Sequence, residues 1–247
     1  MDILYIYNGY KAAAEELRFS LRSIEKNGQN VGRVFLLGVK PDWINPATVK
    51  HIPYSNSQNL YKENDITNAM FHAIADPDVP NRFLVCADDY FYIRPTDFDQ
   101  YPIYVKGILP ESVENKENMG GWKYVRSVVN TRALLMAAGL PVINYGQHCC
   151  FYADRPLMQE FKHLFKAAMY LEFGALYDTM MANIIVDKTG APTVNRRDNK
   201  VDAAANLDDL KRQIGETECF STTERAMNNG LRPILQSLFP DKSKYEL

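Results

Sequence analysis

The feature that most constrains the fold is an apolar run that ends in two adjacent aspartates. Residues 82–87 read Arg-Phe-Leu-Val-Cys-Ala and lead directly into Asp88 and Asp89, and Pro95 closes the segment. A continuous run of this kind predicts a strand buried on both faces, as in a parallel sheet covered by helices. Two carboxylates at the end of such a strand are costly to hold unless a cation offsets their charge.

The two aspartates therefore predict a metal site. Ligands of open α/β sheets bind beyond the carboxyl ends of the strands, where Asp88 and Asp89 would lie. Oxygen ligands suit Mn²⁺ or Mg²⁺, and such a metal keeps positions open for the oxygens of a diphosphate. Neighbouring strand residues point to opposite faces, so both side chains meet one ligand only if the strand ends there. The alternative is a solvated turn that contains two acids.

The rest of the chain alternates between strand and helix patterns. We expect strands at residues 3–7, 33–39, 49–52 and 101–106, and helices at 12–27, 61–75, 125–140, 155–170, 176–186 and 220–239. This alternation predicts an α/β protein with a mainly parallel central sheet flanked by helices. Residues 111–122 are polar and predict a mobile loop, and 188–202 are charged and rich in turn residues. Because no convincing linker interrupts the pattern, we expect one domain over 1–247.

Composition excludes several classes of protein. The net charge of −2 argues against binding of nucleic acid by bulk electrostatics, and no apolar run approaches the ~20 residues that span a bilayer. Motifs of P-loop kinases, dinucleotide oxidoreductases, α/β-hydrolases and zinc proteases are absent from the sequence. The four cysteines (Cys86, Cys149, Cys150 and Cys219) form no CxxC pair. We expect reduced thiols, no zinc site and a cytoplasmic protein without a signal peptide.

Other residues along the chain have side chains suited to metal binding, phosphate binding or proton transfer. His148 would complete the metal coordination or relay a proton, although a lone histidine also serves structural roles. Arg18 and Arg22 share one face of the first predicted helix, and with Lys62 they would neutralise a diphosphate, unless they only line a solvated surface. Asp178 stands in an otherwise apolar helix, as a general base or as a cap for a neighbouring helix.

These residues, in this order, resemble the Stealth family of nucleotide-sugar-dependent transferases. Glu16 to Asn27 reads ELRFSLRSIEKN, where the family has ELRYSLRSIEKN. Pro41 to Asn45 stands where the family has PSWLN, and Ala87 to Phe91 where it has NDDxF. The segment with His148 is similar to a third block, and Cys219 to Thr222 begins a fourth.

The resemblance implies a GT-A-like fold and a metal-dependent transferase that uses a nucleotide sugar, in particular a UDP-sugar. Residues 1–100 would form the nucleotide-sugar-binding half and 101–247 the acceptor-side half. Asp89, Asp178 and His148 would be catalytic, with Asp88, Asp89 and His148 at the metal, and Trp122 would stack on the acceptor. Donor-binding residues would be Tyr7, Asn8, Gly9, Arg18, Arg22, Lys62 and Asp88.

Departures from the family pattern bear on the reaction. Characterised relatives transfer a sugar-1-phosphate, whereas GT-A enzymes transfer the sugar alone. Here Ala87 replaces an asparagine, Ser221 and Thr222 replace Asn-Asp, and an arginine is missing ahead of Asp178. These losses favour glycosyl transfer, with phosphotransfer and a non-catalytic glycan- or partner-binding module as the alternatives. The acceptor would be a glycan or another hydroxyl; a modified DNA base is conceivable, although the charge does not indicate it.

Overall fold

The computed structural model describes residues 1–9, 13–111 and 121–247. Its centre is a five-stranded sheet in the order β11-β5-β1-β3-β4. Strands β1 (Ile3–Tyr7), β3 (Val34–Gly38), β4 (Val49–Pro53) and β5 (Arg82–Ala87) run parallel, and β11 (Phe151–Asp154) pairs antiparallel with β5. The predicted α/β class with a mainly parallel sheet is confirmed.

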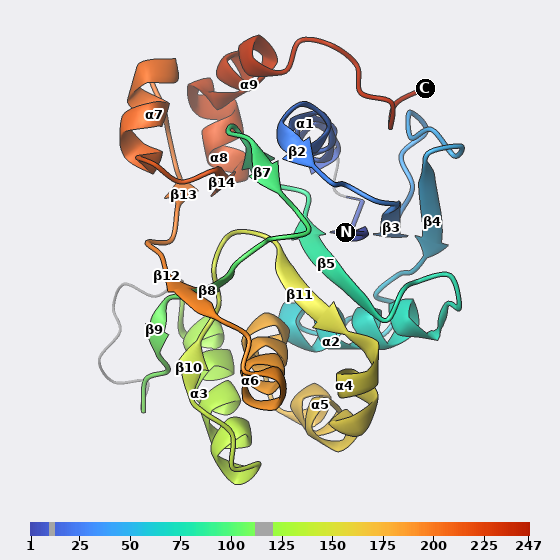
Figure 1. Ribbon diagram of the computed structural model, residues 1–247, viewed down its shortest axis with the longest axis vertical. Coiled ribbons are helices and arrows are strands. Elements are labelled where there is room, and N and C mark those ends of the chain that lie inside the picture. The colour runs from blue at the N-terminus through green and yellow to red at the C-terminus, as the bar shows by residue number, and fades with distance from the viewer. Residues whose placement is uncertain (10–12, 112–120) are drawn as a thin grey trace.

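Helices cover the sheet and bury the main core. They are α1 (Ala13–Asn27), α2 (Lys62–Ala75), α3 (Trp122–Ala137), α4 (Arg155–Glu160), α5 (Lys162–Tyr170) and α6 (Tyr177–Thr189). In the view of Figure 1, α1 lies above the sheet and α2, α5 and α6 lie below it. Apolar side chains from β1, β3 and β5 are nearly inaccessible to solvent, as expected for strands buried on both faces.

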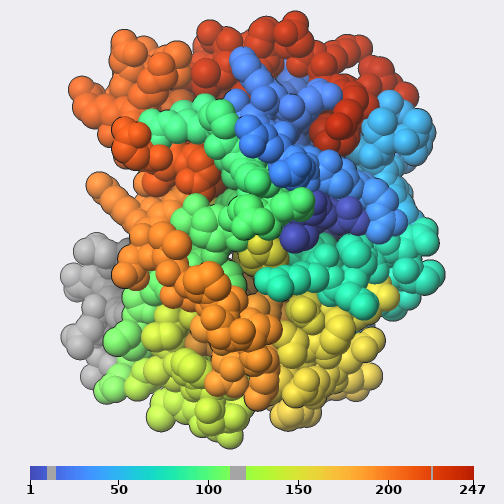
Figure 2. Space-filling view, viewed as in Figure 1, coloured from blue at the N-terminus to red at the C-terminus, as the bar shows by residue number. Residues whose placement is uncertain are grey.

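A second, smaller core lies at the opposite end of the molecule from α3. It is built around a three-stranded sheet of β13 (Lys200–Val201), β14 (Cys219–Thr222) and β6 (Tyr90–Tyr92). Helices α7 (Leu207–Ile214), α8 (Glu224–Ala226), η1 (Met227–Leu231) and α9 (Arg232–Leu238) complete it. Figure 2 shows the C-terminal segment, in red, lying against the N-terminal part of the chain, in blue.

Three two-stranded sheets complete the described part of the structure. They pair β2 (Gly28–Gln29) with β7 (Thr96–Asp97), β8 (Ile103–Val105) with β12 (Thr193–Asn195), and β9 (Gly107–Ile108) with β10 (Ile143–Asn144). The predicted loop at 111–122 lies largely outside the described residues, and α3 begins at its last residue. In the described part of the chain, no helix has the length and apolar character needed to cross a membrane.

Several predicted elements differ from the structure. The aspartates occupy a turn between β5 and β6, so the segment that ends at Pro95 is two strands. The predicted helix 220–239 begins as strand β14, because this short apolar run pairs with β6 from far away in the sequence. A short apolar run has no periodicity that separates helix from strand. Helix α7 was not predicted, and the helix expected over 155–170 breaks into α4 and α5.

The expectation of reduced thiols is wrong for one pair of cysteines. Cys86 at the end of β5 and Cys150 just before β11 form a disulfide with Cα atoms 4.6 Å apart. The antiparallel register of β5 and β11 pairs Val85 with Phe151, so Cys86, which follows Val85, faces Cys150, which precedes Phe151. Cys149 and Cys219 are free and buried. The cytoplasmic location inferred from the thiols stays a prediction.

Candidate active-site cleft

A cleft opens at the carboxyl ends of β1 and β5. Its volume is about 510 Å³, within the range of roughly 300–1,000 Å³ that is typical of small-molecule sites. Segments far apart in the sequence contribute polar side chains to it, among them Asn8, Glu16, Lys62, Glu63, Asp88, Asp89, Gln147, His148 and Asp178. The position agrees with the rule that ligands of open α/β sheets bind beyond the strand ends.

The two aspartates lie in the turn that follows β5. Burial, together with the nearby carboxylates of Asp89 and Glu16, raises the pKa of Asp88 to about 8. Burial also raises the pKa of Asp89, although His148, Lys200 and Lys62 partly offset the shift. Negative charge is therefore costly at this turn, and a cation would relieve the cost.

His148 is held by a carboxylate that the sequence did not reveal. Its ring Nδ1 lies 2.8 Å from Oδ2 of Asp198, and its backbone N–H donates to Oδ1 at 2.9 Å. Nζ of Lys106 donates to the same Oδ2 at 2.7 Å. Burial alone would raise the pKa of Asp198, but these contacts with His148 and Lys106 hold it well below its usual range. The ring is fixed through Nδ1, which leaves Nε2 as the nitrogen available to a ligand.

The far side of the cleft carries a second pair of acids. Asp178 lies in the first turn of α6, where its Oδ1 accepts from the N–H of Thr179 at 2.6 Å and burial raises its pKa. Glu63 lies in the first turn of α2 and is 7% exposed. Burial raises the pKa of Glu63 to about 7; Lys62 opposes this shift and Asp178 adds to it. Glu63 had no distinguishing local pattern, because acids are common at helix starts.

Other predicted residues do not line the cleft. Arg22 forms a bidentate pair with Glu246, at 2.7 Å and 2.8 Å, and Arg18 lies 3.3 Å from the same carboxylate. The structure therefore uses both arginines to attach the C-terminal segment to α1. The ring of Tyr7 is buried, and neither Tyr7 nor Gly9 lines the cleft, although Asn8 between them does.

Trp122 begins α3 and does not line the cleft. It is 62% exposed, and its ring packs against Phe173 with centroids 4.8 Å apart. The structure thus brings together Asn8, Lys62, Asp88, Asp89, His148 and Asp178, and leaves Tyr7, Gly9, Arg18, Arg22 and Trp122 outside the lining.

The donor set fits a metal ion that arrives with a phosphate ligand. Among the residues that the structure describes, no group of three or more His, Cys, Asp or Glu side chains is arranged to hold a metal by itself. Asp88 and Asp89 nevertheless supply two carboxylates, and burial raises both pKa values, so negative charge is costly at this position. Mg²⁺ is commonly bound by one or two carboxylates together with substrate phosphates, which is the arrangement these residues allow.

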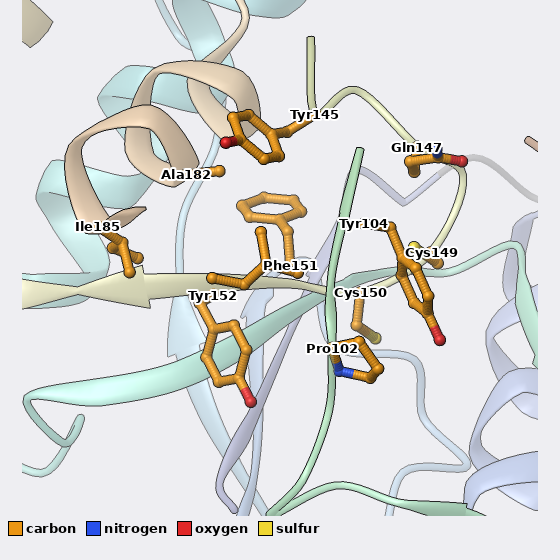
Figure 3. Close-up of a pocket in the computed structure, with 11 residues that line it drawn as sticks. Pro102, Tyr104, Tyr145, Gln147, Cys149, Cys150, Phe151, Tyr152, Ala182 and Ile185 are labelled. Carbon is orange, nitrogen blue, oxygen red and sulfur yellow. The ribbon is translucent and has the colours of Figure 1, made fainter. Parts of the chain in front are cut away.

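A small pocket lies beside the cleft and shares Gln147 and Phe151 with it. Its volume of about 20 Å³ is enough for roughly one water molecule. Figure 3 shows the side chains that line it, among them Tyr145, Phe151 and Ala182 of α6. The pocket is too small for a substrate, so the cleft is the candidate site.

Comparison with known proteins gives a partial match. No family model matches the chain. Over 114 residues it is 26% identical to the capsular polysaccharide phosphotransferase SacB of Neisseria meningitidis serogroup A, a match that covers 43% of this chain and 21% of SacB. The matched segment is thus about a fifth of the length of that relative.

Two solved structures align with most of the chain. The galactosyltransferase LgtC in complex with donor and acceptor sugar analogues aligns over 99% of this chain and 97% of its own, with a TM-score of 0.47 and 14% identity. An active-site mutant of LgtC covers 90% and 87%, with a TM-score of 0.41 and 14% identity. Because TM-scores below 0.5 do not establish a common fold, the functional argument rests on the cleft.

Proposed function

We propose that this protein transfers a sugar from a nucleotide-sugar donor, in particular a UDP-sugar, to a hydroxyl group, with Mn²⁺ or Mg²⁺. One observation carries the proposal: the cleft gathers Asp88, Asp89, His148 and Asp178 from three distant segments at the ends of parallel strands. Paired carboxylates at such a strand end suit a metal-bound diphosphate.

The donor would bind on the strand side of the cleft. Asp88 and Asp89 would hold the metal, which neutralises the negative charge that develops on the leaving diphosphate. Lys62 lines the same cleft and interacts electrostatically with both aspartates, so its ammonium group would reach the same phosphates. Asn8, directly after β1, would contact the ribose or the base.

The acceptor would bind on the side of α2 and α6. As the acceptor oxygen attacks the anomeric carbon, the bond from that carbon to the diphosphate breaks and UDP leaves. The carboxylate of Asp178 would take the hydroxyl proton, for which its raised pKa is favourable. His148, oriented by Asp198, would present Nε2 toward the metal and the donor.

Transfer of a sugar-1-phosphate is the second candidate, and the match to SacB favours it. In that reaction the acceptor attacks phosphorus, the bond between the two phosphates breaks, and UMP leaves. Both reactions need the same donor and the same aspartates. The replacements at Ala87, Ser221 and Thr222 remove polar groups, and for this reason we place sugar transfer first.

The nucleotide that is released tests the proposal. We would incubate the protein with Mn²⁺ and a panel of UDP-sugars and separate the products by chromatography. Release of UDP supports sugar transfer, whereas release of UMP supports phosphotransfer. If neither appears with any nucleotide sugar, and a glycan binds without metal, the protein is a binding module. Asp88→Ala is the matched control, because it should abolish metal-dependent release.

A further inference from the structure

Three aromatic side chains gather beside the cleft, and we name them the aromatic rim: Tyr61, Trp122 and Phe173. The ring of Phe173 lies between the other two in edge-to-face contacts, with centroids 5.2 Å from Tyr61 and 4.8 Å from Trp122. Nζ of Lys123 lies 5.8 Å from the centroid of the Phe173 ring. Trp122 is 62% exposed, so much of its ring surface faces solvent.

The aromatic rim is continuous with the side of the cleft that holds the second acid pair. Tyr61 immediately precedes Lys62 and Glu63, and Trp122 is two residues before Tyr124; all three of these neighbours line the cleft. Tyr124 interacts electrostatically with Asp178 and Glu63. Tyr61 interacts electrostatically with Glu63 and Tyr124, so the aromatic rim lies next to the side of the cleft that these two residues line.

The backbone at Phe173 is held in a conformation that phenylalanine rarely adopts. Its φ is +62°, in the left-handed region, where a bulky residue is strained. Ser127 Oγ donates to the carbonyl of Phe173 at 2.5 Å, and Asn130 Nδ2 donates to the carbonyls on either side at 2.8 Å. The next residue, Gly174, packs so closely on the start of α2 that a Cβ would lie 2.8 Å from a backbone nitrogen.

Contacts with α3 and α2 hold Phe173 in this strained backbone conformation. Glycine or asparagine would adopt the same conformation at lower cost, so packing alone does not explain why a phenylalanine stands here. The conformation holds the Phe173 ring in edge-to-face contact with the Trp122 ring. We propose that the aromatic rim binds a sugar ring of the acceptor, so that the acceptor is a glycan and not a small alcohol. This inference rests on the proposed function.

Pyranose rings present a face of C–H groups that packs on the electron-rich face of an aromatic ring. The exposed Trp122 offers such a face, and the Lys123 ammonium is placed to donate to sugar hydroxyls. A sugar on the aromatic rim would extend its reacting hydroxyl toward Asp178. The base of the donor would bind elsewhere, because its proposed contact, Asn8, lies on the strand side of the cleft.

Kinetics of two variants test this inference. Trp122→Ala should raise the acceptor KM about tenfold with little change in kcat, since one aromatic contact of this kind is lost. Phe173→Gly should do the same, because glycine keeps the left-handed backbone while it removes the ring. Met136→Ala is the control: this side chain is 58% exposed in the last turn of the same helix and should have no effect. Release of nucleotide without acceptor should be unchanged in the Met136→Ala control.

Binding is measured separately from turnover. The chain has two tryptophans, so the Trp43→Phe variant reports on Trp122 alone. We would titrate it with a panel of pyranose di- and trisaccharides and follow the emission; at least one saccharide should shift it. The absence of any shift, or an unchanged acceptor KM in Trp122→Ala, overturns the inference. A shift without any nucleotide release would instead refute the transferase proposal and leave the sugar site standing.

Discussion

Replacement of Asp198 by asparagine tests whether His148 acts through its carboxylate partner. Asp198 accepts from the backbone N–H of His148 with one oxygen, and its other oxygen faces ring Nδ1 at 2.8 Å. Asparagine can keep the first hydrogen bond, but it places an N–H₂ group opposite Nδ1. The imidazole then shifts its proton to Nε2 and loses the lone pair that would face the metal and the donor.

The expected loss follows from the contact that is removed. A hydrogen bond to a charged partner contributes about 1.5–3 kcal/mol, and 1.4 kcal/mol is a factor of ten. The side chains of His148 and Asp198 are 33% and 17% exposed, so solvent weakens the contact only in part. We therefore expect a loss of about 10–100-fold in metal-dependent turnover, which is the usual effect of removing such a partner.

The assay is the release of nucleotide from a UDP-sugar as a function of Mn²⁺ concentration. Asp198→Asn should raise the Mn²⁺ concentration needed for half-maximal rate, and in a His148→Ala background it should have no further effect. Lys106→Met removes the 2.7 Å contact with Asp198 and a 3.3 Å hydrogen bond to the carbonyl of Gly146, leaves the His148–Asp198 contact in place, and should have a smaller effect. An unchanged Mn²⁺ dependence in Asp198→Asn, or an equal loss in both backgrounds, would refute the reasoning.

Three other outcomes follow from the same structure. Asp88→Ala should abolish Mn²⁺-dependent turnover and retain the fold, as monitored by circular dichroism; turnover within about tenfold of wild type would contradict its metal role. The folded-state pKa of Glu63 is raised from 4.5 to about 7, so its contribution to stability is complete below pH 4.5 and is lost as the pH rises through about 7. Glu63→Gln should remove up to about 3 kcal/mol of this pH dependence of the free energy of unfolding, measured by urea denaturation from pH 4.5 to 8. If the free energy of unfolding falls equally with pH in both proteins, Glu63 does not have the raised pKa. Arg22→Ala should lower the free energy of unfolding by about 3 kcal/mol, because it leaves Glu246, whose side chain is 2% exposed, without its bidentate partner. The KM for the donor should not change. A large rise in this KM would instead show that Arg22 helps to bind the donor.

The sequence was informative wherever the signal is local. The apolar run before Asp88 predicted a buried strand, because a strand buried on both faces has a continuous apolar sequence. The spacing of Leu17, Leu21 and Ile24 predicted the first helix, because a helix buried on one face has apolar residues at helical intervals. The same reasoning predicted that ligands would meet the chain at the end of the aspartate strand, since parallel strands present their carboxyl ends at one edge of the sheet.

Reasoning from neighbouring residues could not identify the partners in contacts that join distant segments. Arg18 and Arg22 share a helix face as predicted, but this face meets the C-terminal Glu246 and does not line the cleft. The same holds for Cys86 and Cys150, which face one another only through the register of β5 and β11. In each case the residue type was noticed and its partner was not.

By itself, the sequence determined the class of fold and the buried strand before Asp88, and it singled out His148 and Asp178 for attention, because each depends on residue type and short-range pattern. Only the tertiary structure decided which charges meet. It brought Asp198 to the ring of His148, Glu63 near Asp178, and Phe173 between the rings of Tyr61 and Trp122. The reason is physical: periodicity records which face of an element is buried, whereas a hydrogen bond or an ion pair depends on how elements far apart in the chain are packed.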